Sequence, residues 1–575
     1  MEPVAKQAKE IEDRLGRPLR ILHIGNMANN GFMNSKLLTA AGVDVDLISV
    51  DYYQSVGTPE WEDADFDALN LSDMPDWDQI DIKGYERPRW VAQGPMQQCI
   101  DYLLARRNDA AGSKTNASWN ALNAARAVAI RSAHGKPKGG PRLFFEYVFT
   151  RDSFQIQSRV ARKFNQIYED FLRWNVTYGA PGAILQNLIQ AIYFLIVAFG
   201  YVAILLPWIV LRSTLPRHFA SRADRRWMRQ REQFLVNQFR VCFPDRRDQL
   251  SDSDSRTWSR EELSASIRKL FSHYDIIHAY AYDGIWPLLY TDRPYVAFEH
   301  GTIRQLPFED SPVGRMTALV YRSAAAVLIS NADNNVSAAK LGIEDYRFVP
   351  HPVSEDWIAE VGEDDRFKEW RRKIELLKPS HESLVIFHPP RQHWQEVADG
   401  DPSWQKANHL LYRAFARHAK NSAAPPLLIC IEHGQKIQES KLLLRELGVD
   451  HLVMWIRPLG SRDMTRVMLA SDLIADQFFV GSFGGIPARA MLAAKPVMTI
   501  YRHEMHEWCL PEAPPFLMAK TEEEIFEILN LVDRNSLKLS GELGRRWYQK
   551  YHSNNRIGSD LISTYRSILE KKNEL

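Results

Sequence analysis

Residues 472–497 read DLIADQFFVGSFGGIPARAMLAAKPV, and this stretch decides the fold. An apolar run leads into a glycine-rich turn, a helical stretch follows, and a Pro-Val pair opens the next apolar run, which is one step of a parallel α/β sheet. Gly481, Gly484 and Gly485 allow a backbone to approach a ligand closely. The helix after them would direct its free N–H groups and positive dipole end at that ligand. The stretch therefore predicts an α/β fold with a phosphate site beside the glycines.

Short apolar runs of the same kind recur along the chain, separated by helical stretches. Strands of a parallel sheet are buried on both faces, so they appear in a sequence as continuous apolar runs. We expect strands at 19–25, 45–50, 275–279, 295–299, 326–330 and 346–349, and a second set at 384–388, 427–431, 452–456, 472–476 and 496–500. The two sets predict two Rossmann-like sheets joined near residues 350–356, with ligands at the carboxyl ends of the strands.

These patterns divide the chain into domains. An N-terminal Rossmann-like domain is expected over residues 1–355, and a C-terminal one over 356–535. Helices in 536–575 are expected to pack back across the junction. A long helical insertion at about 96–265 interrupts the first domain, and the acidic, tryptophan-rich stretch at 52–95 is expected to be a solvated loop region.

Composition and motifs exclude several classes of protein. Hydrophobic residues make up 45% and charged residues 25%, as in a folded globular protein, and the formal net charge of +1 provides no field that would recruit nucleic acid. The four cysteines lack the short spacings of a zinc site or a disulfide framework, so reduced cytosolic thiols are expected. GxSxG, HExxH and CxxC motifs are absent, which argues against a serine hydrolase and a catalytic metal. The charged stretch at 1–20 does not resemble a secretory signal.

The insertion contains the most unusual segment of the chain. Residues 174–211 carry no charge, and 188–211 read LIQAIYFLIVAFGYVAILLPWIVL. A helix of that length is about 36 Å long, enough to cross a hydrocarbon layer of about 30 Å. A single crossing would place strands of one sheet on opposite sides of a membrane. We therefore expect the apolar segment at 183–211 to bend and to leave the membrane on the face where it enters. The alternative is a core helix buried within the insertion.

Charge around that segment favours the cytoplasmic leaflet, because basic residues outnumber acids on both flanks. The basic residues are Arg159, Arg162, Lys163 and Arg173 before the segment, and Arg212, Arg217, Arg222, Arg225, Arg226, Arg229 and Arg231 after it. We expect a peripheral or monotopic protein at the cytoplasmic face of the inner membrane.

The glycine-rich stretch resembles the donor-site loop of GT-B glycosyltransferases similar to family 4, whose pattern has two glutamates, an Ala-Met-Ala run, a glycine and a Pro-Val pair. The matching residues are Phe483, Gly484, Pro487, Ala490, Met491, Pro496 and Val497. The resemblance covers both α/β parts and leaves out the insertion. It implies that residues 1–355 form the acceptor domain and 356–535 the donor-binding domain. The donor-site residues that it implies in this loop are Gly481, Ser482, Phe483, Gly484, Gly485 and Arg489.

Three positions depart from the family pattern. Ser482 and Arg489 stand where the family has its two glutamates, and Ala494 stands where it has the helix glycine. In the family the second glutamate holds the ribose hydroxyls of the nucleotide, and an arginine cannot accept those hydrogen bonds. Either the donor lies differently, or Asp476 or Gln477 substitutes, or donor binding is degraded.

Two cations follow the first strand of the C-terminal set. Residues 387–411 resemble the family's strand that precedes an arginine and a lysine on the donor diphosphate, and Arg391 and Lys406 take those positions. Cleavage of a bond to a nucleoside diphosphate builds negative charge on the leaving phosphate, and fixed cations stabilise that charge. The alternative is that both are ordinary surface cations. His433, at the end of the next strand, is expected near the same ligand.

Strand ends in the N-terminal half carry the remaining candidates. In the family a histidine of this half often contacts the sugar or the acceptor. His300 follows a strand, and Glu299 beside it is a candidate acid or base. The turn that begins at Gly25 and Asn26 is expected to contact acceptor or donor phosphate, and it lacks the GxGxxG pattern of a nicotinamide site. His351, at the crossover between the halves, is expected to be structural.

The combined interpretation is a membrane-associated glycosyltransferase of the hexosyltransferase type. It would move a sugar from a nucleotide-sugar to an acceptor, and the apolar segment favours a lipid-linked acceptor in envelope or exopolysaccharide synthesis. The resemblance implies a retaining, metal-independent reaction without a cofactor, in which the leaving diphosphate helps to deprotonate the acceptor. Two alternatives stay open. One is a non-catalytic GT-B scaffold of a membrane complex, which Ser482 and Arg489 favour, and the other is a GT-B sugar-nucleotide epimerase, which would not need the apolar segment.

Overall fold

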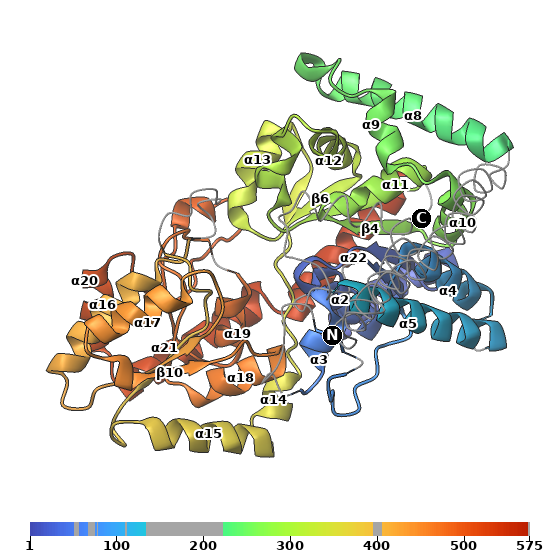
Figure 1. Ribbon diagram of the computed structural model, residues 1–575. Coiled ribbons are helices and arrows are strands. Elements are labelled where there is room, and N and C mark those ends of the chain that lie inside the picture. Colours follow the sequence, from blue (N-terminus) through green and yellow to red (C-terminus); the bar gives the residue numbers. More distant parts are fainter. Residues whose placement is uncertain are drawn as a thin grey trace, which may run out of the picture. The chain divides into compact units, whose positions relative to one another are not determined.

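The computed structural model describes residues 1–50, 57–66, 75–77, 79–109, 112–133, 222–394, 405–482 and 484–572. The chain forms two compact units, one of Met1–Ile130 with Lys269–Leu575, and one of Arg131–Arg268. The first unit contains both β-sheets (Figure 1). All the candidate site residues also belong to it.

The N-terminal sheet is parallel throughout, with the strand order β3-β2-β1-β4-β5-β6-β7. Its strands are β1 (Arg20–Ile24), β2 (Asp44–Ser49), β3 (Val91–Gln93), β4 (Ile276–Tyr280), β5 (Tyr295–Glu299), β6 (Ala326–Ile329) and β7 (Tyr346–Phe348). Every strand expected in this half is confirmed to within one residue at each end. The strand β3 is additional, because its three residues are too short to stand out as an apolar run. The order changes direction between β1 and β4, so the loops after these two strands diverge at the carboxyl edge.

The C-terminal sheet is also parallel, with the order β10-β9-β8-β11-β12-β13. Its strands are β8 (Val385–His388), β9 (Leu427–Ile431), β10 (Val453–Ile456), β11 (Leu473–Ala475), β12 (Val497–Thr499) and β13 (Leu517–Met518). The expected strands are again confirmed to within one residue at each end, and only the two-residue β13 was not anticipated. Here the order changes direction at β8, between β9 and β11.

Each face of the C-terminal sheet packs on helices, as the alternation of its side chains requires. Phe387, Leu427 and Ile429 lie in one apolar cluster with α18 (Ser461–Ala470) and α19 (Gly485–Leu492). Ile386 and Leu428 lie in another cluster with α16 (Asn408–Asn421) and α20 (Glu522–Leu531). Burial on both faces explains why these strands read as unbroken apolar runs.

The end of the chain returns to its beginning. The helical stretch expected after residue 536 is two helices, α21 (Arg534–Tyr551) and α22 (Asn554–Lys571), and Ser553 caps the second. Trp547 of α21 lies in the core of the C-terminal half. By contrast, α22 packs against α1 (Glu2–Leu15) and α2 (Asn30–Ala40), and Leu561 and Tyr565 complete the core of the N-terminal half (Figure 1).

The described parts of the insertion are helical. They include α4 (Met96–Asn108), α5 (Ser113–Ala133), α8 (Arg222–Cys242), α9 (Asp252–Trp258) and α10 (Glu261–Phe271). Residues 96–130 belong to the first unit, where α4 packs against β2 and β3. The apolar segment at 183–211 lies outside the described residues. Among the residues that are described, no helix is both long enough and apolar enough to cross a membrane.

The expectation of a solvated loop at 52–95 is wrong for the stretch 57–66. This stretch contains the short helix α3 (Pro59–Asp63), and Phe66 after it is buried. Burial of a charge is costly unless the charge is paired. The acidic side chains of this stretch are tolerated because each forms an ion pair with a basic side chain. Glu60 pairs with Arg126 at 2.8 Å, Asp63 with Lys36 at 2.8 Å, and Asp65 with Arg466 at 2.5 Å.

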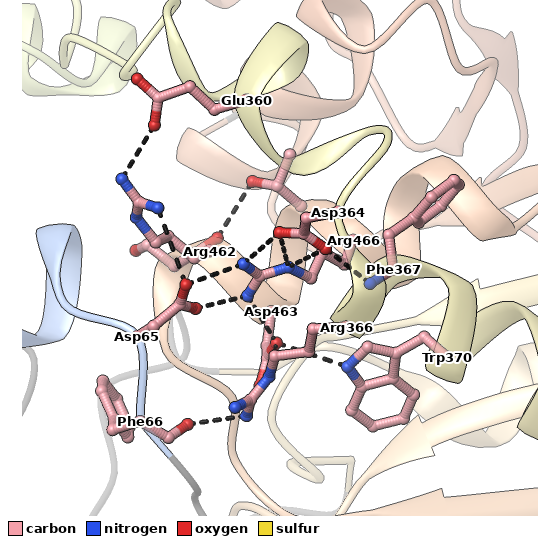
Figure 2. A network of polar contacts seen from close by, with 12 residues as sticks. Asp65, Phe66, Glu360, Asp364, Arg366, Phe367, Trp370, Arg462, Asp463 and Arg466 are labelled. Carbon is pink, nitrogen blue, oxygen red and sulfur yellow. Dashed lines mark hydrogen bonds and ion pairs between the residues drawn. The ribbon is translucent and has the colours of Figure 1, made fainter. Parts of the chain in front are cut away.

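A network of ion pairs joins this stretch to the C-terminal half (Figure 2). The guanidinium of Arg466, on α18, donates to Asp65, to Asp364 at 2.6 Å and to Asp463 at 2.9 Å. Arg366, on α15 (Asp365–Leu377), donates to Asp463 at 2.7 Å and to the carbonyl of Phe66 at 2.7 Å. The network therefore holds a segment of the N-terminal half against two helices of the C-terminal half.

Candidate functional site

The candidate residues of the C-terminal half follow the strands at which the strand order changes direction. The loop after β8 carries Arg391, and the loop after β11 runs over residues 476–482. His388, at the end of β8, donates from Nδ1 to the carbonyl of Ala475 at 2.8 Å and accepts from the Asn408 amide at 2.9 Å. That amide also donates to the carbonyl of Arg391 at 3.2 Å. The two loops are thus fixed to each other where ligands bind in open α/β sheets.

Lys406 connects both loops through its charged end. Its Nζ donates to Gln477 Oε1 at 2.9 Å. Burial lowers the pKa of Lys406 to about 8; Asp476 opposes this effect, whereas the charges of Arg391 and Arg304 add to it. Burial raises the pKa of Asp476 to about 6, and the charge of Lys406 acts in the other direction. Lys406 is therefore a partly desolvated cation with other positive charges nearby.

Arg391 and His433 lie in the same cluster as Lys406. Burial lowers the pKa of Arg391. Burial also lowers the pKa of His393 to about 4, and the charges of Arg391, His433 and Lys406 lower it further. The backbone N–H of Gln392 donates to the carbonyl of His433 at 2.7 Å, which pins the loop after β9 to the loop after β8. The structure thus brings Arg391, Lys406 and His433 together.

The turn after β11 uses its glycines in different ways. Gly481 has φ of 84°, in the left-handed region, and a Cβ there would collide with the side chain of Arg502. Ser482 is buried, and its carbonyl accepts from Gln477 Nε2 at 2.8 Å, so Gln477 links Lys406 to this turn. Gly484 and Gly485 form the start of α19, and a Cβ on Gly484 would meet no atom within 4 Å. Phe483 lies outside the described residues.

Arg489 is directed toward the N-terminal half. Its guanidinium donates to the carbonyl of Ser461 at 3.1 Å, lies 3.6 Å from a carboxylate oxygen of Glu62, and stands 5.9 Å from the ring centroid of Trp357. The arginine that replaces a family glutamate thus has an acidic neighbour from the other half.

His300 is a neutral imidazole with a defined tautomer. Its Nδ1 lies 2.9 Å from Ser330 Oγ, and that hydroxyl donates its own proton to the carbonyl of Glu299 at 3.0 Å. Ser330 must therefore accept from His300, which places the imidazole proton on Nδ1 and the lone pair on Nε2. Burial lowers the pKa of His300 to about 4, and the charge of Arg304 lowers it further. His300 offers a neutral hydrogen-bond acceptor.

Glu299, expected as an acid or base, is fully buried and anchors the turn beyond His300. Its carboxylate accepts from the backbone N–H of Gly301, from that of Ile303 at 2.9 Å, and from the hydroxyl of Tyr321. Burial raises the pKa of Glu299, and these hydrogen bonds oppose the rise. Both carboxylate oxygens are occupied, which favours a structural role for this residue.

The turn at Gly25 and Asn26 is shaped by buried contacts. Gly25 has φ of 91°, and a Cβ there would collide with the carboxylate of Asp283, which follows β4. Asn26 donates both amide protons, one to Asn29 Oδ1 at 2.7 Å and one to the carbonyl of Gly57 at 2.8 Å. The side chain of Asn26 therefore holds the turn against the stretch at 57–66. Because both amide protons are used in this way, the contact with a ligand phosphate that the sequence predicts would come from the backbone of the turn.

Two residues that the sequence did not predict as site residues lie among these candidates. Arg304 pairs with Asp333 at 2.7 Å, and its charge lowers the pKa of both His300 and Lys406, so it lies between candidates of the two halves. His351 was expected to be structural. It lies beside His300, with ring centroids 6.1 Å apart, and its Cδ2 is 3.8 Å from the position of a Cβ on Gly485. The sequence signal that could have identified His351 as a site residue is its position shortly after the strand β7, just as His300 follows β5.

Comparisons with known proteins found similarity among solved structures. No protein-family profile matches the chain, and no curated protein matches it. HepE of Anabaena, solved with UDP and glucose, is 17% identical over 53% of this chain and 81% of its own, with a TM-score of 0.42. Sucrose-phosphate synthase from Thermosynechococcus elongatus is 14% identical over 54% and 80%, with a TM-score of 0.39. A UDP-forming α,α-trehalose-phosphate synthase from Burkholderia xenovorans is 12% identical over 59% and 86%, with a TM-score of 0.40.

Proposed function

We propose that this protein is a glycosyltransferase that takes a sugar from a nucleotide-sugar. The observation that carries the proposal is the cluster of Arg391 and Lys406 beside the glycine turn that opens α19. Desolvated cations are costly unless an anion offsets the cost. A diphosphate has the charge for two cations, and its oxygens accept from the free N–H groups at the start of a helix.

In the proposed reaction the bond between the sugar and the diphosphate breaks. Negative charge then develops on the leaving diphosphate, where Lys406, Arg391 and the N-terminus of α19 stabilise it. The oxygen of the acceptor hydroxyl forms a bond to the anomeric carbon of the sugar, and the hydroxyl passes its proton to the leaving diphosphate, so no strongly basic side chain is required. His300 accepts a hydrogen bond from a hydroxyl of the sugar or the acceptor. We propose that the reaction is retaining and needs neither a metal ion nor a cofactor.

The acceptor that we propose is a lipid-linked glycan, reached at the cytoplasmic face of the inner membrane. Its support is the uncharged stretch at 174–211 and the basic residues on both sides of it. Arg226, Arg229 and Arg240 of α8, which follows that stretch, are exposed to solvent and suit anionic headgroups. Synthesis of an envelope or exopolysaccharide glycan fits such an acceptor.

Binding of nucleotides tests the donor site. We expect the wild type to bind at least one of UDP, GDP or ADP in calorimetric titrations. Lys406→Met is expected to weaken that binding about 10- to 100-fold, because a charge-assisted hydrogen bond contributes roughly 1.5–3 kcal/mol. Lys520→Met, at an exposed lysine of the same half, is the matched control and should leave the affinity unchanged.

Two outcomes of that titration would contradict the proposal. A wild type that binds none of the three nucleotides would support the non-catalytic scaffold. A Lys406→Met variant with unchanged affinity would place the nucleotide elsewhere. Incubation with a matching nucleotide-sugar separates transfer from epimerisation, since an epimerase changes the sugar without releasing the nucleoside diphosphate.

Fractionation of cells tests the membrane proposal. The wild type should sediment with membranes in high salt, and polar residues in place of Leu195, Ile196 and Val197 should release it. Apolar replacements of the same three residues are the control and should leave it in the membrane fraction. A wild type that is soluble without detergent would overturn this part of the proposal.

A further inference from the structure

The proposed donor site lacks the carboxylates that would hold sugar or ribose hydroxyls. Ser482 and Arg489 occupy those positions, and Asp476, the carboxylate nearest in sequence, is buried and lies within the electrostatic reach of Lys406. Hydroxyl groups of a ligand need acceptors, because a polar group that loses water without gaining a partner costs free energy. Another acceptor lies beside the start of α19, on His351.

The hydrogen bonds of His351 define its tautomer. Asn30 Nδ2 donates to the carbonyl of Met27 at 3.1 Å, so Asn30 Oδ1 is the amide atom that faces His351 Nδ1. A carbonyl oxygen only accepts, so His351 donates from Nδ1 and keeps a lone pair on Nε2. Burial holds the pKa of His351 well below its ordinary value, and the proximity of His300 and Arg489 lowers it further. The side chain is a neutral acceptor at physiological pH.

The backbone fixes where that acceptor lies. Pro350 and Pro352 flank His351, and each proline ring restricts the local backbone. The carbonyl of His351 accepts from His552 Nε2 at 3.0 Å, between α21 and α22. His351 Cδ2, the ring carbon bonded to Nε2, lies 3.8 Å from where a Cβ on Gly485 would stand, at the start of α19. Among the residues that the structure describes, none donates a hydrogen bond to Nε2.

His351 also lies in a series of neighbouring residues from both halves of the first unit. Lys406 contacts Gln477, Gln477 contacts Ser482, and the turn leads to Gly485, which lies beside His351. From there His351 neighbours His300, and the charge of Arg304 acts on both His300 and Lys406.

We propose that His351 Nε2 accepts a hydrogen bond from a hydroxyl of the donor's sugar, in place of the missing carboxylates. This inference rests on the proposed function. A phosphate oxygen without a proton cannot donate to a lone pair, so Nε2 selects a hydroxyl against the diphosphate itself. A neutral imidazole also avoids the repulsion that a carboxylate would exert on a diphosphate close by. Asn30 is the positioning residue that keeps the lone pair on Nε2.

Two amide variants separate the roles of the imidazole nitrogens. In His351→Asn the amide N–H lies close to where Nδ1 was, so the hydrogen bond to Asn30 is kept and the acceptor is lost. In His351→Gln the longer side chain carries its amide close to the position of Nε2, where its oxygen accepts. The affinities of the two variants and the wild type are measured by calorimetric titration of the full chain with UDP and UDP-glucose. GDP and GDP-mannose replace these ligands if the wild type prefers GDP.

We expect His351→Asn to bind the nucleotide-sugar about tenfold more weakly and the nucleoside diphosphate within about twofold of the wild type, since a hydrogen bond contributes roughly 0.5–1.5 kcal/mol. His351→Gln should recover most of the affinity for the nucleotide-sugar. Equal losses for both ligands, or no loss for either, would overturn the assignment. A wild type that binds neither nucleotide nor nucleotide-sugar would instead overturn the proposed function and this inference with it. The thermal midpoint of each variant, measured without ligand, shows whether it is folded.

Discussion

Lys406 carries its charge in a setting that disfavours it. Because burial lowers the pKa of Lys406 to about 8, the side chain is charged at neutral pH and loses its proton as the pH rises through that value. We predict that the affinity for a nucleoside diphosphate falls between about pH 7 and about pH 9.5. A bound diphosphate favours the charged form, so the midpoint of the fall should lie above the pKa of the free protein.

The matched variant for that titration is Lys406→Arg. An arginine stays charged over this range, so the affinity of the variant should change little with pH. Calorimetry over the same pH series compares the two proteins. The prediction is contradicted by a wild-type affinity that is flat with pH, or by a variant whose affinity falls in parallel with it.

Two other histidines lie in the core of the N-terminal sheet. His23 on β1 and His278 on β4 are paired in register and fully buried, with ring centroids 4.7 Å apart. Burial lowers the pKa of His278 to about 3, and burial together with the neighbouring His278 lowers that of His23 well below its ordinary value. Both side chains are therefore neutral in the folded protein over the physiological range.

We predict that stability declines as the pH falls below about 6.5. In that window the unfolded chain binds protons at both histidines and the folded protein does not, so the free energy of unfolding drops by up to about 1.4 kcal/mol per pH unit for each. Thermal midpoints measured from about pH 7.5 to about pH 4.5 test this. His278→Phe should make the decline shallower, and a wild-type midpoint that stays constant over the range would contradict the prediction.

At the scale of elements, the stretch at 57–66 is held from both ends. At its start, Asn26 and Asn29 donate to the carbonyls of Gly57 and Thr58 at 2.8 and 2.9 Å. At its end, the ring of Phe66 packs closely on Gly460: a Cβ on Gly460 would lie 2.5 Å from Cζ of Phe66. The stretch therefore joins the turn after β1 to the start of α18, and with it the two halves that carry the proposed site.

Arg466 is the central residue of that connection. Its side chain is 1% exposed and faces three carboxylates. We predict that Arg466→Met destabilises the first unit by about 1.5–3 kcal/mol, because Asp65 and Asp364 lose charge-assisted hydrogen bonds while Asp463 keeps Arg366. Asp65→Asn should cost about 1 kcal/mol, since Asp364 and Asp463 still hold the guanidinium.

Thermal midpoints of the two single variants and the double variant measure this difference. The effects should not add, because both substitutions act on one network. Equal losses in the two single variants would contradict the central place of Arg466.

The strands could be predicted from the sequence because both faces of each sheet are buried, so that an apolar run marks a strand directly. Strands as short as β3 and β13 leave no such run. The stretch at 57–66 misled the prediction because its acids are paired with Arg126, Lys36 and Arg466, which are distant in sequence. Arg391 and Lys406 could be selected from a motif, whereas the place of His351 depends on Asn30, some 321 positions away, and on Gly485.

At the scale of the whole molecule, α22 belongs to the N-terminal half in space although it ends the chain. Leu561, Ile562 and Tyr565 are fully buried in the cluster that also holds Val4 of α1. Burial of each large apolar side chain contributes roughly 1.5–3 kcal/mol, so the helix contributes about as much as the net stability of a domain.

We predict that a chain ending at His552 loses a folded N-terminal half and becomes insoluble. A chain that ends at Lys572 is the control and should behave as the full chain does. Gly558→Val is a milder test, because a Cβ there would lie 2.8 Å from Leu37 Cδ2 and 2.9 Å from Val4 Cγ1. We expect it to lower the stability by about 1–3 kcal/mol. Soluble, cooperatively melting protein from the shortened chain would contradict the assignment of α22 to this core.

The return of α22 also has a consequence for biosynthesis. A ribosome produces the strands of the N-terminal sheet early, but the helix that covers one face of that sheet leaves the exit tunnel only after the strands of both sheets. The C-terminal half has its own core by then, whereas the N-terminal sheet still exposes the surface that Leu561 and Tyr565 cover. Exposed apolar surface of this kind recruits chaperones and promotes aggregation. The nascent chain therefore depends on protection until α22 has left the tunnel.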